Sequence, residues 1–127
     1  MFIIKKIETK ENFMSETIEK LREWGCDIDG AFERFLNDRD LYNECLSMFV
    51  EDENIFELEK HINDDDQQVP FVIVHTLKGV AGNLGITPLY ESLVTLCESL
   101  RVNKYDKNSG EYERVDRDLK KFLSIMS

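Results

Sequence analysis

Residues 75–85 read His-Thr-Leu-Lys-Gly-Val-Ala-Gly-Asn-Leu-Gly. The apolar positions of this stretch recur with the spacing of an amphipathic helix, yet the stretch also holds three glycines. Each interior glycine costs a helix roughly 1 kcal/mol relative to alanine, so Gly79 and Gly82 together cost about 2 kcal/mol. Some property of this helix face must therefore favour the absence of side chains.

On a helix over residues 69–85, the apolar stripe and the histidine lie on opposite faces. At about 100° per residue, the core stripe comprises Ile73, Leu77, Val80 and Leu84. His75 falls on nearly the opposite side, where Gly82 is almost in line with it and Gly79 lies beside it. The glycines thus bare the surface next to His75, where the backbone or a loop of another protein can approach.

The residues around His75 favour a phosphoryl-accepting site. Neutral imidazole is a nucleophile near physiological pH, because its unperturbed pKa is about 6.5. Lys78 follows one helical turn later, where its ammonium group can neutralise the charge of a phosphoryl group. We therefore predict His75 as the nucleophile and Lys78 as the phosphoryl-stabilising residue. The predicted docking surface comprises Phe71, which adds an apolar rim one turn before the histidine, together with Gly79 and Gly82.

Helical spacing recurs along most of the 127-residue chain, and strand patterns are nearly absent. We expect a single domain over residues 1–127 and an all-α fold, an antiparallel four-helix bundle with additional N-terminal and C-terminal helices. The bundle core is expected at about 38–101, the N-terminal helices at about 9–37 and the C-terminal helix at about 110–126. The extreme N-terminal segment, Phe2-Ile3-Ile4, fits a docking arm, a strand-like tail or a disordered end equally well.

Several helix boundaries follow from capping residues. Gly25 and Gly85 are expected to end helices, and Asp29 is expected to cap the short helix that follows. Thr87 is the expected N-cap of a later helix, with Pro88 at its first helical position. For the helix near 41–52, the expected core positions are Leu41, Cys45, Met48 and Phe49.

The charge balance excludes some partners. The chain has 16 basic and 26 acidic residues, a formal net charge of -10, which argues against nucleic acids and anionic membrane surfaces. No apolar run approaches the length of a membrane span. The widely spaced cysteines, Cys26, Cys45 and Cys97, form no zinc motif and indicate reduced thiols in the cytoplasm.

The remaining candidate ligands do not form a metal motif. The acidic run at 64–66 lacks the spacing of a calcium-binding loop, so we interpret it as a helix terminus and loop whose carboxylates favour the positive end of the next helix. The other histidine, His61, is interpreted as a solvated surface residue. No metal or cofactor is therefore expected on this chain.

The stretch from His75 to Gly85 resembles the signature of histidine-containing phosphotransfer (HPt) domains, the helical relay proteins of multistep two-component signalling. The similarity covers roughly residues 24–101. It includes the segments 24–35 and 41–52, and the helix after the motif with its stripe of Leu89, Leu93, Leu96 and Leu100.

The resemblance implies a specific function. His75 would accept a phosphoryl group from a phospho-aspartate on one receiver domain and pass it to an aspartate on another. Lys78 would stabilise the phosphoryl group, and Gly79 and Gly82 would admit the receiver's active-site loops. The expected partners are response-regulator receiver domains and a hybrid sensor histidine kinase. Magnesium would belong to the receiver, and no kinase activity of the chain's own is expected.

Two points stay open at this stage. Several family members place a glutamine near the phosphohistidine, at a position that corresponds here to Cys97. Either another residue, such as Glu98, or no side chain would therefore orient His75. An HPt-like adaptor that binds a receiver without phosphotransfer is the alternative function. We expect a monomer, and the initial methionine and helical C-terminus favour a whole protein over an excised domain.

Overall fold

The computed structural model describes the backbone of residues 2–127 and the side chains of residues 11–127. The described chain forms seven helices and no strand, which confirms the all-α class. The helices are α1 (Phe2–Trp24), α2 (Ile28–Arg34), α3 (Arg39–Val50), α4 (Glu53–His61), α5 (Gln68–Leu84), α6 (Thr87–Arg101) and α7 (Glu111–Met126). The backbone of Phe2-Ile3-Ile4 belongs to α1, so the interpretation of this segment as a strand-like tail is wrong. The interpretation as a docking arm concerns side chains that lie outside the described residues.

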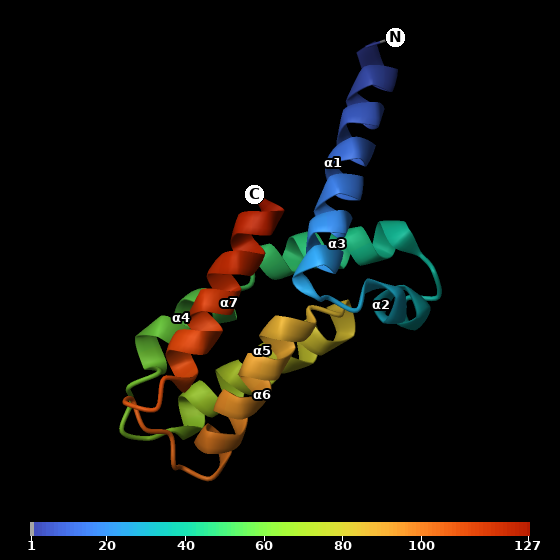
Figure 1. Ribbon diagram of the computed structural model, residues 1–127. Coiled ribbons are helices and arrows are strands. Elements are labelled where there is room, and N and C mark those ends of the chain that lie inside the picture. The colour runs from blue at the N-terminus through green and yellow to red at the C-terminus, as the bar shows by residue number, and fades with distance from the viewer. Residues whose placement is uncertain (1) are drawn as a thin grey trace.

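The C-terminal helices form the body of the molecule. Figure 1 shows α4, α5, α6 and α7 running side by side, with α5 packed against both α4 and α6, and α7 packed along α6. Helices α1, α2 and α3 gather at the end of this body where α5 turns into α6. The bundle core predicted at about 38–101 includes α3 and leaves the C-terminal helix outside. In the structure, the C-terminal helix α7 packs along α6. The aromatic rings of Phe49 and Phe122, 5.1 Å apart, join α3 to α7.

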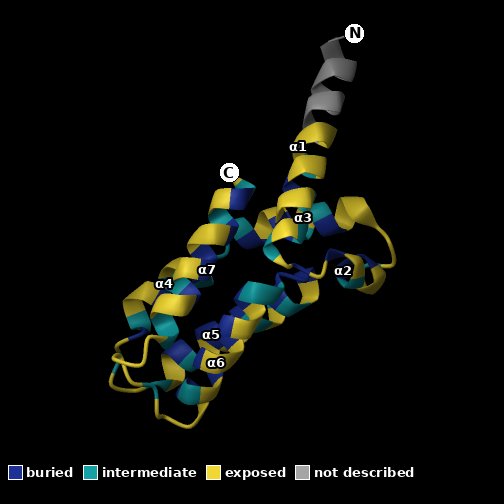
Figure 2. Ribbon diagram, in the orientation of Figure 1, coloured by how far each residue is buried: buried dark blue, intermediate teal, exposed yellow. Residues whose placement is uncertain are grey.

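The core lies on the facing sides of the helices, and exposed residues line the outward sides (Figure 2). The buried stripe of α3 differs from the predicted one: Tyr42, Leu46 and Phe49 are buried, while Met48 is 65% exposed. The ring of Tyr42 packs edge-on against Phe32 with centroids 5.1 Å apart. This aromatic contact between α2 and α3 favours an orientation of α3 that buries Tyr42 and exposes Met48.

Two predicted helix caps are wrong. Asp27, rather than Asp29, caps α2, because its carboxylate accepts a hydrogen bond from the Gly30 amide at 3.0 Å. Asp29 instead pairs with Arg22 at 2.9 Å. At α6 the N-cap is Ile86, and Thr87 is already inside the helix.

Other boundaries agree with the sequence. Gly25 and Gly85 follow α1 and α5 with positive φ values of 102° and 74°, which are readily adopted by glycine. Asp66 lies just before α5 and accepts a hydrogen bond from the Gln68 amide at 3.0 Å, so the acidic run does end at a helix start. Within residues 2–127, no helix combines the length and the apolar character that crossing a bilayer requires.

Candidate functional site

The side chain of His75 is exposed on α5 and rests on an aromatic ring. The imidazole stacks with Phe71, with ring centroids 5.7 Å apart and an interplanar angle of 29°. Phe71 is half-buried and packs against the hydrophobic core, so it provides a fixed surface beneath the imidazole. No described side chain forms a hydrogen bond with His75, which leaves its ring nitrogens accessible to a partner.

Lys78 lies one turn beyond His75 and is half-buried. Among the described side chains it has no ion-pair partner within 4.0 Å, although its charge acts on nearby Cys97 and Glu98 of α6. Lys78 therefore carries a charge one turn from His75 that forms no ion pair with any described carboxylate. This arrangement suits an ammonium that balances an incoming anion.

The glycines of α5 have different structural environments. A Cβ atom added at Gly79 would meet no other atom within 4 Å, so nothing in the chain's own packing requires glycine there. A Cβ atom at Gly82 would lie 3.2 Å from the ring carbons of Tyr90, which covers this part of α5 from α6. The prediction that Gly82 leaves a bare surface is thus correct only in part, because Tyr90 occupies some of the space.

Gly85 is required by the fold. Its φ of +74° is unfavourable for other residues, and an added Cβ would lie 2.3 Å from the carbonyl oxygen of Asp27. The Asp27 amide also donates to the Gly85 carbonyl at 2.9 Å. The segment between α1 and α2 is therefore in direct contact with the turn that ends α5.

Residues far apart in the sequence satisfy the last carbonyl groups of α5. The guanidinium of Arg34 donates to the carbonyls of Gly82 at 2.9 Å and Asn83 at 3.2 Å. The hydroxyl of Tyr42 donates to the Leu84 carbonyl at 2.7 Å. Burial raises the pKa of this phenol, so it remains a proton donor at neutral pH. These contacts fix the C-terminal turn of the helix that carries His75.

An open depression of about 490 Å³ lies beside the glycines, and we call it the α5 depression. It is lined by Asp27, Arg34, Lys78, Gly79, Ala81, Gly82, Asn83, Gly85, Thr87 and Tyr90. It adjoins the exposed face that carries His75, since Lys78 and Gly79 belong to both. Three of the predicted site residues, Lys78, Gly79 and Gly82, thus line the α5 depression. The other two, His75 and Phe71, lie beside it on the same helix.

Cys97 and Glu98 do not orient the imidazole. Cys97 is buried, and this burial raises the pKa of its thiol, although the nearby charge of Lys78 opposes the effect. Glu98 forms an ion pair with Arg101 on its own helix, and the hydrogen bond from Arg101 lowers the pKa of its carboxyl. Of the two possibilities that the sequence leaves open, the described residues therefore favour an imidazole without a side-chain hydrogen bond.

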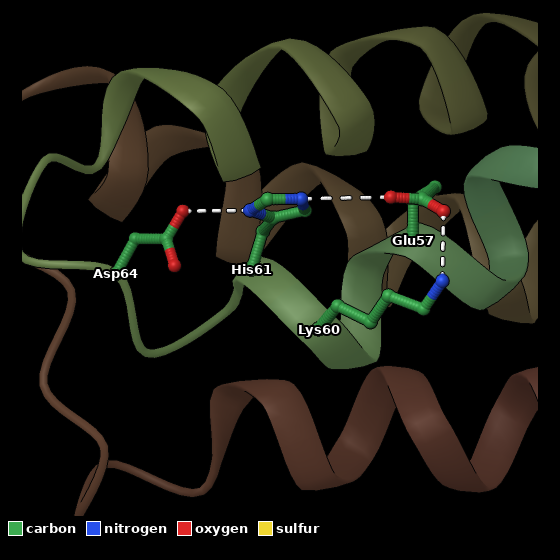
Figure 3. Close-up of polar contacts among 4 residues, drawn as sticks. All are labelled: Glu57, Lys60, His61 and Asp64. Atoms are coloured by element: carbon green, nitrogen blue, oxygen red, sulfur yellow. Dashed lines mark hydrogen bonds and ion pairs between the residues drawn. The ribbon is translucent and has the colours of Figure 1, made fainter.

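The second histidine is less free than the sequence suggests. The Nδ1 atom of His61 lies 2.8 Å from an Asp64 carboxylate oxygen, and its Nε2 atom lies 3.5 Å from a Glu57 oxygen (Figure 3). Lys60 also contacts Glu57, at 3.1 Å. Both ring nitrogens of His61 thus face carboxylates, in contrast to those of His75. The described side chains include no group of three or more His, Cys, Asp or Glu residues that is placed to hold a metal ion.

The family model described as "Hpt domain" matches residues 44–124, more than half of the chain. No curated relative and no solved structure matches this chain. The matched range includes α4 to α7 and hence the exposed histidine of α5, its neighbouring lysine and most of the residues that line the α5 depression, though not Asp27 and Arg34. The chain belongs to the Hpt domain family, whose members carry phosphoryl groups in two-component signalling and interact with receiver domains.

Proposed function

We propose that this protein is a phosphocarrier of a multistep two-component phosphorelay, with His75 as the phosphorylated residue. The observation that carries the proposal is an exposed imidazole without a described hydrogen-bond partner, followed one turn later by a lysine without a described ion pair, on a helix inside the matched family region. His61 in the same region has carboxylates at both ring nitrogens and is the poorer candidate.

The proposed transfer is a displacement at phosphorus. The lone pair of a His75 ring nitrogen forms the nitrogen–phosphorus bond, while the bond between phosphorus and the receiver's aspartate oxygen breaks and the aspartate leaves as a carboxylate. A second receiver's aspartate then attacks the same phosphorus and releases the imidazole. Such transfer depends on positioning and charge stabilisation. Stacking on Phe71 positions the imidazole, and Lys78 stabilises the charge of the phosphoryl group. Magnesium would reside on the receiver.

The partners follow from this chemistry. The chain would exchange phosphoryl groups with response-regulator receiver domains, one of them belonging to a hybrid sensor histidine kinase in the cytoplasm. Because one face of α5 must serve successive receivers, we propose a monomer with transient contacts and no kinase activity of its own.

A two-receiver assay tests the relay. The protein is first labelled by a receiver domain that carries a radioactive phosphoryl group, then purified and mixed with a second receiver and magnesium. The proposal predicts that the label leaves the protein and appears on the second receiver. Label that enters this protein but never leaves it would contradict a carrier role.

Replacing Lys78 with alanine should slow phosphoryl transfer about tenfold without ending it. The loss corresponds to about 1.4 kcal/mol of barrier, a reasonable contribution for one partly exposed charge beside a developing phosphoryl anion. Rapid-quench kinetics with a phosphorylated receiver measures the effect, and Lys78→Arg should retain most of the rate because it keeps the charge. An unchanged rate in the alanine protein would remove Lys78 from the site.

Replacing Gly79 with alanine should separate stability from function. The new Cβ meets no atom of the chain, so the better helix propensity of alanine should raise the free energy of unfolding by about 1 kcal/mol. The same methyl group occupies the surface proposed for the receiver, so transfer should slow. Urea denaturation and transfer kinetics measure the two effects. A protein that is more stable and transfers equally fast would show that receivers do not approach Gly79.

A further inference from the structure

Arg34 on α2 reaches across the fold into the α5 depression. Its Nη2 and Nε atoms donate to the carbonyls of Gly82 and Asn83, which lie 48 and 49 residues later in the sequence. The side chain remains exposed and lines the same hollow as Lys78 and Gly79. A residue outside the matched family range, 44–124, therefore contributes a cation beside the histidine face.

The hydrogen bonds to α5 position the guanidinium in advance. The carbonyl end of a helix carries partial negative charge, which holds a cation there. Arginine has more N–H donors than the two that these carbonyls use, so its remaining donors can bind a carboxylate. Because the side chain is already restrained, it loses less conformational freedom when a partner docks.

The charge of the depression differs from that of the whole chain. The chain has a formal net charge of -10, which repels an acidic partner over most of its surface. Within the depression, Arg34 and Lys78 outnumber the single acidic residue, Asp27, whose carboxylate also caps α2 through the Gly30 amide. The depression is therefore a small cationic surface on an acidic protein.

We propose that Arg34 is a specificity-determining residue that binds a carboxylate at the rim of the receiver's active site. This inference rests on the proposed function, because a partner that holds an acceptor aspartate and Mg²⁺ must gather carboxylate ligands around that site. The cation on α2 selects such an acidic surface, while Lys78 acts on the phosphoryl group itself.

The rival explanation is that Arg34 only caps α5. Capping alone predicts a less stable protein whose folded molecules bind and accept phosphoryl groups normally. Docking predicts weaker binding that depends on charge and salt. The binding of the folded Arg34→Gln protein separates the two explanations, because capping alone leaves its affinity normal whereas docking predicts a weaker affinity. Arg34→Lys keeps the charge but lacks the planar group that bonds both carbonyls, so it tests whether the charge is sufficient for binding.

The test measures the affinity of an isolated receiver domain by calorimetry, together with KM and kcat for transfer from the same receiver after phosphorylation by acetyl phosphate. Arg34→Gln should raise Kd and KM about five- to tenfold and leave kcat unchanged. Arg34→Glu should raise them further, and Arg34→Lys should restore most of the parent values. Raising the salt concentration should weaken binding less in Arg34→Gln than in the parent. Arg114→Gln, an equal charge change on the exposed face of α7, should have little effect.

The outcomes distinguish this inference from the proposed function. If the parent protein is phosphorylated but Arg34→Gln binds and transfers like the parent, the role of Arg34 is overturned and the relay stands. An equal loss in Arg114→Gln would also overturn it, because net charge alone would then explain the effect. If Arg34→Gln fails to fold, failure of the folded Arg34→Lys protein to bind like the parent would overturn the inference. A parent that neither binds receivers nor accepts phosphoryl groups would overturn both proposals.

Discussion

Replacing His75 with glutamine is expected to abolish phosphoryl labelling of the protein while leaving its fold intact. Glutamine has no nucleophilic nitrogen, so the nitrogen–phosphorus bond cannot form. The His75 side chain is exposed and has no described hydrogen-bond partner, so little stability depends on it. Intact-mass analysis after incubation with a phosphorylated receiver measures the labelling, and circular dichroism during urea denaturation measures stability.

His61 provides the matched control. His61→Gln should label like the parent, because both ring nitrogens of this residue face carboxylates in the folded protein. It should also be slightly less stable, since it loses the contacts that the two ring nitrogens of His61 make with Asp64 and Glu57. Labelling that survives in His75→Gln and disappears in His61→Gln would reverse the assignment of the two histidines.

Replacing Gly85 with alanine is expected to produce the largest loss of stability among the substitutions considered, on the order of 3 kcal/mol. The φ of +74° disfavours any side chain by about 1 kcal/mol. In addition, the Cβ would lie 2.3 Å from the Asp27 carbonyl oxygen, so two backbone segments must separate. The hydrogen bond from the Asp27 amide to the Gly85 carbonyl would weaken with them.

Gly110→Ala isolates the contribution of the backbone conformation. Gly110 also has a positive φ, 82°, but an added Cβ would meet no atom within 4 Å. This substitution should therefore cost only about 1 kcal/mol. Urea denaturation of both variants measures the difference, which reports the contact between the α1–α2 segment and the end of α5. Equal losses in the two proteins would show that this contact does not restrict the turn.

The sequence predicts the histidine face well, because its evidence is local. Spacing along one helix places His75 opposite Leu77, and the structure exposes the former and buries the latter. The sequence also predicts the end of this helix at Gly85, because a glycine after an apolar repeat is a strong signal for the end of a helix. The core stripe of α5 is only partly as predicted, since Val80 is half-buried and Val74 is fully buried.

The sequence did not predict the surroundings of α5, because they depend on contacts between distant segments. Nothing near Arg34 indicates that it bonds carbonyls 48 residues away, and nothing near Tyr90 indicates that its ring covers Gly82. Tyr42 left a usable signal: its spacing of four and seven residues from Leu46 and Phe49 is that of a buried helix face. The capping error at α2 arises because two aspartates lie at the start of this helix. Asp27 directly precedes its first residue and Asp29 belongs to its first turn, and only the geometry shows which of them is the cap.

The most direct test of the account is to locate the phosphoryl group on the protein. The protein is incubated with a phosphorylated receiver domain and magnesium, kept at neutral or alkaline pH, and analysed by intact-mass spectrometry followed by peptide fragmentation. The account predicts the addition of one phosphoryl group, located at His75 and lost on brief acidification. Measurable binding to receivers without any gain in mass, or a phosphoryl group located at another residue, would contradict it.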